Sequence, residues 1–199
     1  MLPEFGAERL SDGRSLAIPF YWVPAPAVRE RLETKTKKEW LLGWRDVTDA
    51  RTSARTLVAS ILPMSGVGDN FLLMFPQKDA REVACLLSSL NSLVVDYYAR
   101  QKVGGLSLKY FTMKQLPILP PSAYESDCVW LDSSCTAWVG CRVKELTYTC
   151  WDVASFAYDL GYDGPPFLWT VPGALHSNGT TETRGTLIWS STIKPKGMS

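Results

Sequence analysis

The pattern of apolar and polar positions predicts one long helix near the middle of the chain. Between residues 79 and 102, apolar side chains recur every three or four positions and so fall on one side of an α-helix. They are Val83, Leu87, Leu90, Val94 and Tyr97. Asp79 and Glu82 have capping-box spacing, Asp96 and Arg100 are spaced as an i,i+4 ion pair, and two glycines at 104–105 end the element. We therefore expect a helix over 79–102 to support the fold.

Alternating and continuous apolar runs predict strands on both sides of this helix. They are expected near residues 17–23, 40–47, 56–62, 71–75 and 106–111. In the second of these, Trp40, Leu42 and Trp44 alternate with less apolar residues, which indicates an aromatic face. A short helix is expected within 24–32, with Pro26 near its first turn. The predicted fold class is α+β, a small, mostly antiparallel sheet packed on one long helix (79–102).

The C-terminal part is predicted to be a small helical appendage. Residues 122–141 are rich in Ser and Cys and lack periodicity, whereas helical spacing returns over 142–161. The expected organisation is a loose lead-in (1–16), a main domain (17–121), a connector with the helical appendage (122–169) and an irregular tail (170–199).

The charge of the chain is balanced overall but uneven along it. The formal net charge is +1, which gives no global argument for binding nucleic acid or a membrane. However, Arg100, Lys102, Lys109 and Lys114 lie in a stretch without an acid, and acids dominate residues 125–163. A near-neutral total can therefore hide a basic surface.

The sequence favours a cytoplasmic protein that does not enter a membrane. Its first ten residues lack the pattern of a signal peptide, and no apolar run is long enough to span a bilayer. Five cysteines without an export signal indicate free thiols in a reducing compartment. Four of them gather at Cys128, Cys135, Cys141 and Cys150, but this spacing favours scattered thiols over a zinc site.

Motifs for catalysis are missing. The single histidine, His176, lies in the expected tail, which makes a Ser-His-Asp or Cys-His site improbable. Gly66-Val67-Gly68 precedes a strand and lacks a third glycine, so it indicates a turn and not a phosphate loop. We predict no catalytic residue and no metal ligand, and the residues on their own suggest a binding module.

Two groups of basic residues are candidates for binding. Arg45, Arg51 and Arg55 are interleaved with Thr and Ser, the residue types that contact phosphates and base edges. Lys102, Lys109 and Lys114 follow the long helix, and a basic segment with an aromatic residue can grip a nucleic-acid backbone. On composition alone, a solvated polar loop explains the first group better, and a charged surface loop explains the second equally well.

Several segments in order carry a resemblance to one family. They are RTSART (51–56), SILP (60–63), LSSLNSLVVDYYARQK (87–102), LPILPP (116–121), ELTYTCWD (145–152) and GYDGPPF (161–167). These segments resemble the C-terminal target-recognition domain of adenine-specific N6 DNA methyltransferases. Such enzymes belong to type II (type IIG) restriction-modification and related phage-defence systems. A similar helix and proline-rich exit occur in the recognition domains of type I specificity subunits.

The resemblance implies a division of labour. A separate Rossmann-like domain would bind S-adenosylmethionine and methylate a flipped adenine, while the recognition domain reads and holds the duplex. This chain lacks the Asn/Asp-Pro-Pro-Tyr motif of that chemistry, so the expected cofactor belongs to a missing domain. We expect double-stranded DNA as the partner, with Arg45, Arg51 and Arg55 at bases or phosphates and Lys102, Lys109 and Lys114 at the backbone. A methyltransferase domain or chain is a further expected partner.

Two alternatives remain open at this stage. A face exposing Trp40 and Trp44 would suit a protein-interaction module. After Trp169 the sequence departs from the Arg- and Leu-rich helical segment of the family, which also fits an inactive remnant of such an enzyme.

Overall fold

A three-stranded antiparallel sheet lies at the centre of the protein. The computed structural model describes residues 12–16, 21–130 and 132–168. The strand order is β2-β1-β3, with β1 at Trp40–Arg45, β2 at Ala59–Pro63 and β3 at Phe71–Met74. In the register, Leu42 of β1 lies opposite Ile61 on one side and Met74 on the other. Together with six α-helices in the described part of the chain, this sheet confirms the predicted α+β class.

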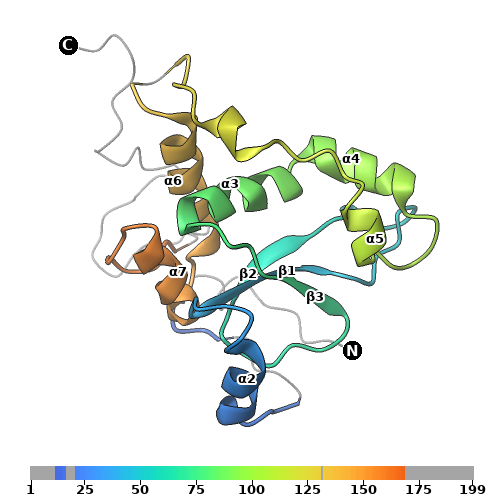
Figure 1. Cartoon of the computed structure of the whole chain (residues 1–199), viewed down its shortest axis with the longest axis horizontal. Coiled ribbons are helices and arrows are strands. Elements are labelled where there is room, and N and C mark those ends of the chain that lie inside the picture. The colour runs from blue at the N-terminus through green and yellow to red at the C-terminus, as the bar shows by residue number, and fades with distance from the viewer. Residues whose placement is uncertain (1–11, 17–20, 131, 169–199) are drawn as a thin grey trace, which may run out of the picture.

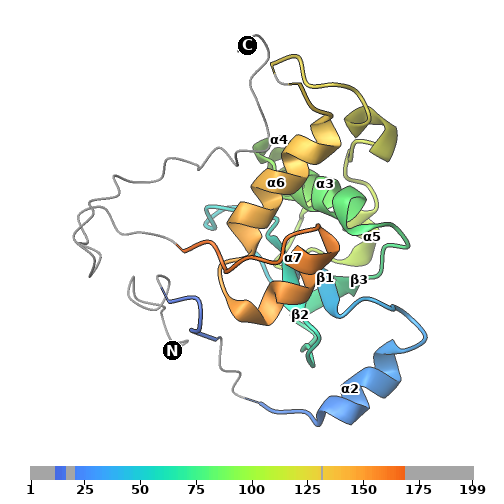
Figure 2. The same ribbon diagram turned by 90° about the vertical axis from the view of Figure 1, so that its left-hand side faces the viewer.

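The central strand is buried on both of its faces. Trp40, Leu42 and Trp44 point into the main core, and Leu41 belongs to a second apolar cluster on the opposite face, under α2 (Ala25–Leu32). Figures 1 and 2 show α2 on the other side of the sheet from α3 and α4. The predicted alternation is therefore confirmed. The predicted exposure of the tryptophan face is wrong, because Trp40 and Trp44 are only 2% and 1% exposed.

The helix predicted over 79–102 is broken into two. α3 spans Ala80–Leu90 and α4 spans Leu93–Lys102. The predicted start is confirmed, since the Asp79 side chain accepts a hydrogen bond from the backbone N–H of Glu82. The break follows from Ser92, which caps α4 by accepting a hydrogen bond from the Val95 backbone N–H.

The break rotates the buried face of the second helix. In α3 the predicted stripe is confirmed, and Val83, Leu87 and Leu90 are buried. In α4 the buried residues are Val95, Asp96 and Ala99, so Val94 and Tyr97, predicted on the same stripe, are exposed. The glycines at 104–105 do not provide a left-handed end, because neither has a positive φ.

One of the five predicted strands is not a strand, and another falls largely outside the described residues. Residues 21–23 lie outside any strand, and residues 17–20 are outside the described part. Residues 106–111 form one bridge, Ser107 to Val47, and then enter the short helix α5 (Tyr110–Met113). The chain leaves the strand conformation there because the backbone N–H groups of Thr112 and Met113 both turn back to the Lys109 carbonyl.

The C-terminal helices complete the main core. α6 (Cys135–Thr147) packs across α3, as Figure 2 shows. It starts inside the stretch predicted to be irregular, because Ser134 provides an N-cap that the periodicity did not indicate. A 3-10 turn at Trp151–Val153 and α7 (Ala154–Asp159) follow, and Phe156 of α7 packs edge-on against Trp40. None of the helices in the described residues has the length and apolarity needed to cross a membrane.

Candidate nucleic-acid interface

The connection between β1 and β2 is fastened to α4 by a buried carboxylate. One oxygen of Asp96 accepts hydrogen bonds from the backbone N–H groups of Thr56 and Leu57, at 2.9 and 2.8 Å. The same carboxylate lies 3.4 Å from the Arg55 guanidinium and 3.7 Å from that of Arg100. A buried charge requires such pairing, because its desolvation is otherwise costly. Asp96 thus fixes the position of the loop relative to the helix.

Arg100 holds the same connection from a second point. Its guanidinium donates to the carbonyl oxygens of Ala50, Ser53 and Ala54, at 2.8, 3.1 and 3.1 Å. Three carbonyls on one rigid, planar donor set define the backbone path of the loop. The Asp96–Arg100 ion pair expected from spacing is confirmed. The structure shows in addition that both side chains bind the backbone of the β1–β2 connection.

The break between α3 and α4 also contacts this connection. The Arg55 guanidinium donates to the Asn91 carbonyl at 2.7 Å, and the Asn91 side chain pairs with the Ala59 backbone on β2. Arg55, a predicted DNA contact, is therefore engaged within the protein, with its side chain 34% exposed.

A second connection lies alongside the first. The Thr48 backbone N–H donates to the Leu106 carbonyl, and the Leu108 N–H donates to the Asp46 carbonyl, at 2.9 and 2.8 Å. Lys109, another predicted contact, forms an ion pair with the buried carboxylate of Asp46. The segment 106–109 is therefore joined to the end of β1.

The remaining predicted residues are exposed. Arg45, at the end of β1, donates to the Arg55 carbonyl at 3.2 Å. The Lys102 ammonium lies 3.5 Å from the side-chain oxygen of Gln115. Because Gln115 directly follows Lys114, the segments that carry the two lysines lie side by side. Arg51 has 86% of its side chain exposed, against 34% for Arg55.

Arg51 is presented by a tight local turn. The Asp49 side chain accepts hydrogen bonds from the Arg51 backbone N–H and the Thr52 hydroxyl, at 2.9 and 2.8 Å. These hydrogen bonds hold the pKa of Asp49 below its usual value. The Arg51 guanidinium also lies 3.4 Å from Asp49, a weak exposed pair that a stronger anion can replace.

The structure therefore brings the segments that carry all six predicted residues to one end of the molecule. Figure 1 shows α4, α5 and the β1–β2 connection together, with α6 and α7 at the other end. Arg45, Arg51, Lys102 and Lys114 are open to solvent, and Arg55 and Lys109 are held by buried acids. Sequence reasoning missed Asp46 and Asn91, whose only local signal is a polar residue next to an apolar run.

An apolar strip borders this end. On the outward side of α4, Leu93 is 75% exposed, and Val94, Tyr97 and Tyr98 are also exposed. The two tyrosine rings meet edge to face, 6.1 Å apart. An exposed strip of this kind is typical of a surface that meets a partner.

Comparisons with known proteins add no relative. No family model matches the chain. No curated protein and no solved structure is significantly similar to it. The chain's own residues and its resemblance to the recognition domains of adenine-specific methyltransferases are what bear on its function.

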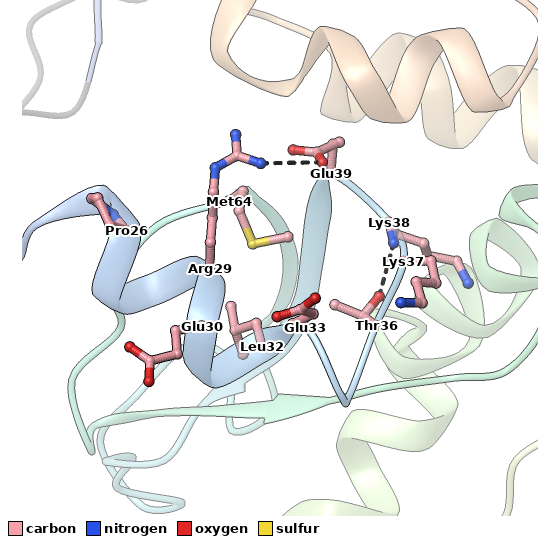
Figure 3. Close-up of a pocket in the computed structure, with 10 residues that line it drawn as sticks. All are labelled: Pro26, Arg29, Glu30, Leu32, Glu33, Thr36, Lys37, Lys38, Glu39 and Met64. Carbon is pink, nitrogen blue, oxygen red and sulfur yellow. Dashed lines mark hydrogen bonds and ion pairs between the residues drawn. The ribbon is translucent and has the colours of Figure 1, made fainter.

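Two hollows beside α2 do not coincide with this end. One, of about 560 Å³, lies between α2 and the turn before β1. Arg29 and Glu39 form an ion pair of 3.4 Å at its rim, drawn as a dashed line in Figure 3. Its lining mixes both signs of charge with Leu32 and Met64, which gives no preference for an anion. Within the described residues, no group of three or more His, Cys, Asp or Glu side chains could hold a metal ion. His176 lies outside them.

Proposed function

We propose that this chain recognises specific sequences in double-stranded DNA as part of an adenine N6-methyltransferase or restriction-modification system. The observation that carries the proposal is the β1–β2 connection, which is fixed underneath by Asp96 and Arg100 while Arg51 projects into solvent. A rigid loop with an open guanidinium suits readout of guanine or phosphate, since little conformational freedom is lost on binding.

The roles divide according to whether the charge is already paired with a buried acid. Arg51 and Arg45 contact base edges or phosphates, and Lys102 and Lys114 contact the DNA backbone from the end of α4 and the segment after α5. Arg55 and Lys109 act as supports of these segments, because their charges are already paired with Asp96 and Asp46. The methyl transfer and the S-adenosylmethionine site belong to a separate domain or chain.

The test begins with selection of bound duplexes from a randomised library, followed by affinity measurements by fluorescence anisotropy over a salt series. Arg51→Ala is expected to weaken binding of the selected duplex by about 1–3 kcal/mol and to relax its sequence preference. Lys102→Ala and Lys114→Ala are expected to weaken binding to all duplexes by a similar factor. Each should also reduce the slope of log affinity against log salt concentration by about one.

Arg81→Ala is the matched control, because Arg81 is an exposed cation on α3. Its affinity should equal that of the wild type. The proposal fails if the three variants bind as the wild type does, or if wild-type binding shows no dependence on salt.

A second candidate function is docking of another protein, for which the apolar strip of Leu93, Val94, Tyr97 and Tyr98 provides the observation. Val94→Asp would then abolish association seen by gel filtration, and DNA affinity would be retained. If the strip instead contacts DNA, the same substitution weakens binding of the duplex and leaves the elution volume of the protein unchanged.

A further inference from the structure

Two cysteine sulfurs meet away from the DNA-binding end. The thiol of Cys128 lies 3.5 Å from the sulfur of Cys135. Cys128 is buried, and Cys135, the first residue of α6, is half-buried. Both are free thiols in this structure. At 3.5 Å the sulfurs are in van der Waals contact, so a bond of about 2.05 Å requires only a small movement.

The backbone, and not chance packing, brings these thiols together. Asp127 and Ser134 form an antiparallel bridge. On either side of it, the Cys128 N–H donates to the Ser133 carbonyl at 2.8 Å and the Cys135 N–H donates to the Ser126 carbonyl at 2.9 Å. Successive side chains of an extended chain alternate in direction, so both cysteines extend from the same face of the bridge. This geometry is that of a preformed dithiol.

The bridge is also anchored to the main core. The Thr136 hydroxyl donates to the Tyr124 carbonyl at 2.7 Å, and the Tyr124 hydroxyl pairs with Ser89 of α3. The two segments that carry the thiols are therefore held relative to α3 and to each other. Because folding already fixes both segments, forming a disulfide between these thiols costs the folded chain little additional conformational entropy.

The two thiols differ in access, which sets an order of reaction. Burial raises the pKa of Cys128 to about 11, so few of these thiols are ionised at neutral pH. Cys135 is more exposed and stands at the start of a helix capped by Ser134. The thiol that meets a reagent first is thus Cys135, and Cys128 resolves the product.

The geometry points to Cys128 and Cys135 as a redox site, oxidised to an intramolecular disulfide by exchange with a low-molecular-weight disulfide. The Cys135 thiolate attacks one sulfur of the small disulfide, forms a mixed disulfide and releases one thiolate. The Cys128 thiolate then attacks the Cys135 sulfur, forms the internal bond and releases the second thiolate. The protein loses two electrons and two protons, and the small disulfide becomes two thiols.

The test exposes the full-length chain to oxidised glutathione and follows it by intact mass and peptide mapping. The wild type is expected to lose the mass of two hydrogen atoms and to yield a Cys128–Cys135 cross-linked peptide. The thermal midpoint of the oxidised protein should rise by about 5 °C, since a short loop is closed in the unfolded chain.

Single substitutions distinguish the two roles. Cys128→Ser should stop at the mixed disulfide on Cys135, and Cys135→Ser should form neither product at this site. Cys141→Ser, which removes another half-buried thiol of α6, should still form the cross-link. The inference is overturned if the wild type stays reduced, accumulates only mixed disulfides, or cross-links other cysteines.

Discussion

The side-chain amide of Asn91 forms two hydrogen bonds with the backbone of Ala59. The Ala59 N–H donates to the Asn91 side-chain oxygen at 3.1 Å, and the Asn91 side-chain nitrogen donates to the Ala59 carbonyl at 2.9 Å. Ala59 lies on β2, an outer strand of the sheet, so the amide satisfies backbone groups that would otherwise face a sheet edge. The interruption between α3 and α4 therefore joins the helices to the sheet.

Replacement of Asn91 by alanine should test this joint. Asn91→Ala removes both hydrogen bonds and leaves the Ala59 backbone groups without these partners, so we expect a loss of about 2–3 kcal/mol in the free energy of unfolding. Urea denaturation measures the change. The exposed Asn70 offers a control, and Asn70→Ala should stay within about 0.5 kcal/mol of the wild type. Equal losses in the two variants would contradict the role of Asn91.

A larger effect is expected at Asp96. Asp96→Ala leaves two arginines without their buried counter-charge and two backbone N–H groups without an acceptor, which should cost about 3–5 kcal/mol. Asp49→Ala, at a half-buried carboxylate that accepts one hydrogen bond from the backbone and one from a hydroxyl, should cost clearly less than Asp96→Ala. Denaturant unfolding measures both losses of stability. A small loss in Asp96→Ala would show that other contacts hold the β1–β2 connection.

The local pattern predicted some elements well because local interactions decide them. β1 and β2 follow from alternation, β3 follows from a continuous apolar run, and the start of α3 follows from the Asp79 cap. The break at Asn91–Ser92 could not be predicted this way, since the apolar spacing continues through it to Val94 and Tyr97. The break lies at the Ser92 cap, and the neighbouring Asn91 pairs with Ala59, a residue distant in sequence, so tertiary contacts accompany the departure from local periodicity.

The candidate site shows the same limit. The basic residue types and their family-like order indicated Arg51 and Lys114, and both are exposed. Asp46 is the buried partner of Lys109, and Asp96 is that of Arg55. Sequence gave no reason to pair them, because each pair joins segments that meet only in the folded chain.

Gly43 should be intolerant of any side chain. A Cβ there would lie within 3.0 Å of the Leu72 carbonyl oxygen and the Phe71 ring, in the middle of the sheet. Gly43→Ala should therefore lower the free energy of unfolding by about 1–3 kcal/mol. Gly68→Ala provides the comparison, because a Cβ at that glycine meets nothing within 4 Å. If thermal and urea unfolding give the two variants equal losses of stability, β3 does not approach β1 as closely at Gly43 as described.

The last prediction concerns alkaline pH and the buried thiol of Cys85. Burial raises its pKa from 9.0 to about 11 in the folded protein. Between these values the unfolded chain loses the proton and the folded protein keeps it. The stability associated with the neutral thiol is therefore complete below pH 9 and is lost as the pH rises toward 11. The difference in unfolding free energy between the wild type and Cys85→Ala should shrink by about 2 kcal/mol across this window. Cys85→Val, which packs differently, should show the same pH-dependent part, since that part belongs to the wild-type thiol. A difference that stays constant from pH 8 to pH 11 in both variants would mean that the folded thiol titrates as an exposed one does.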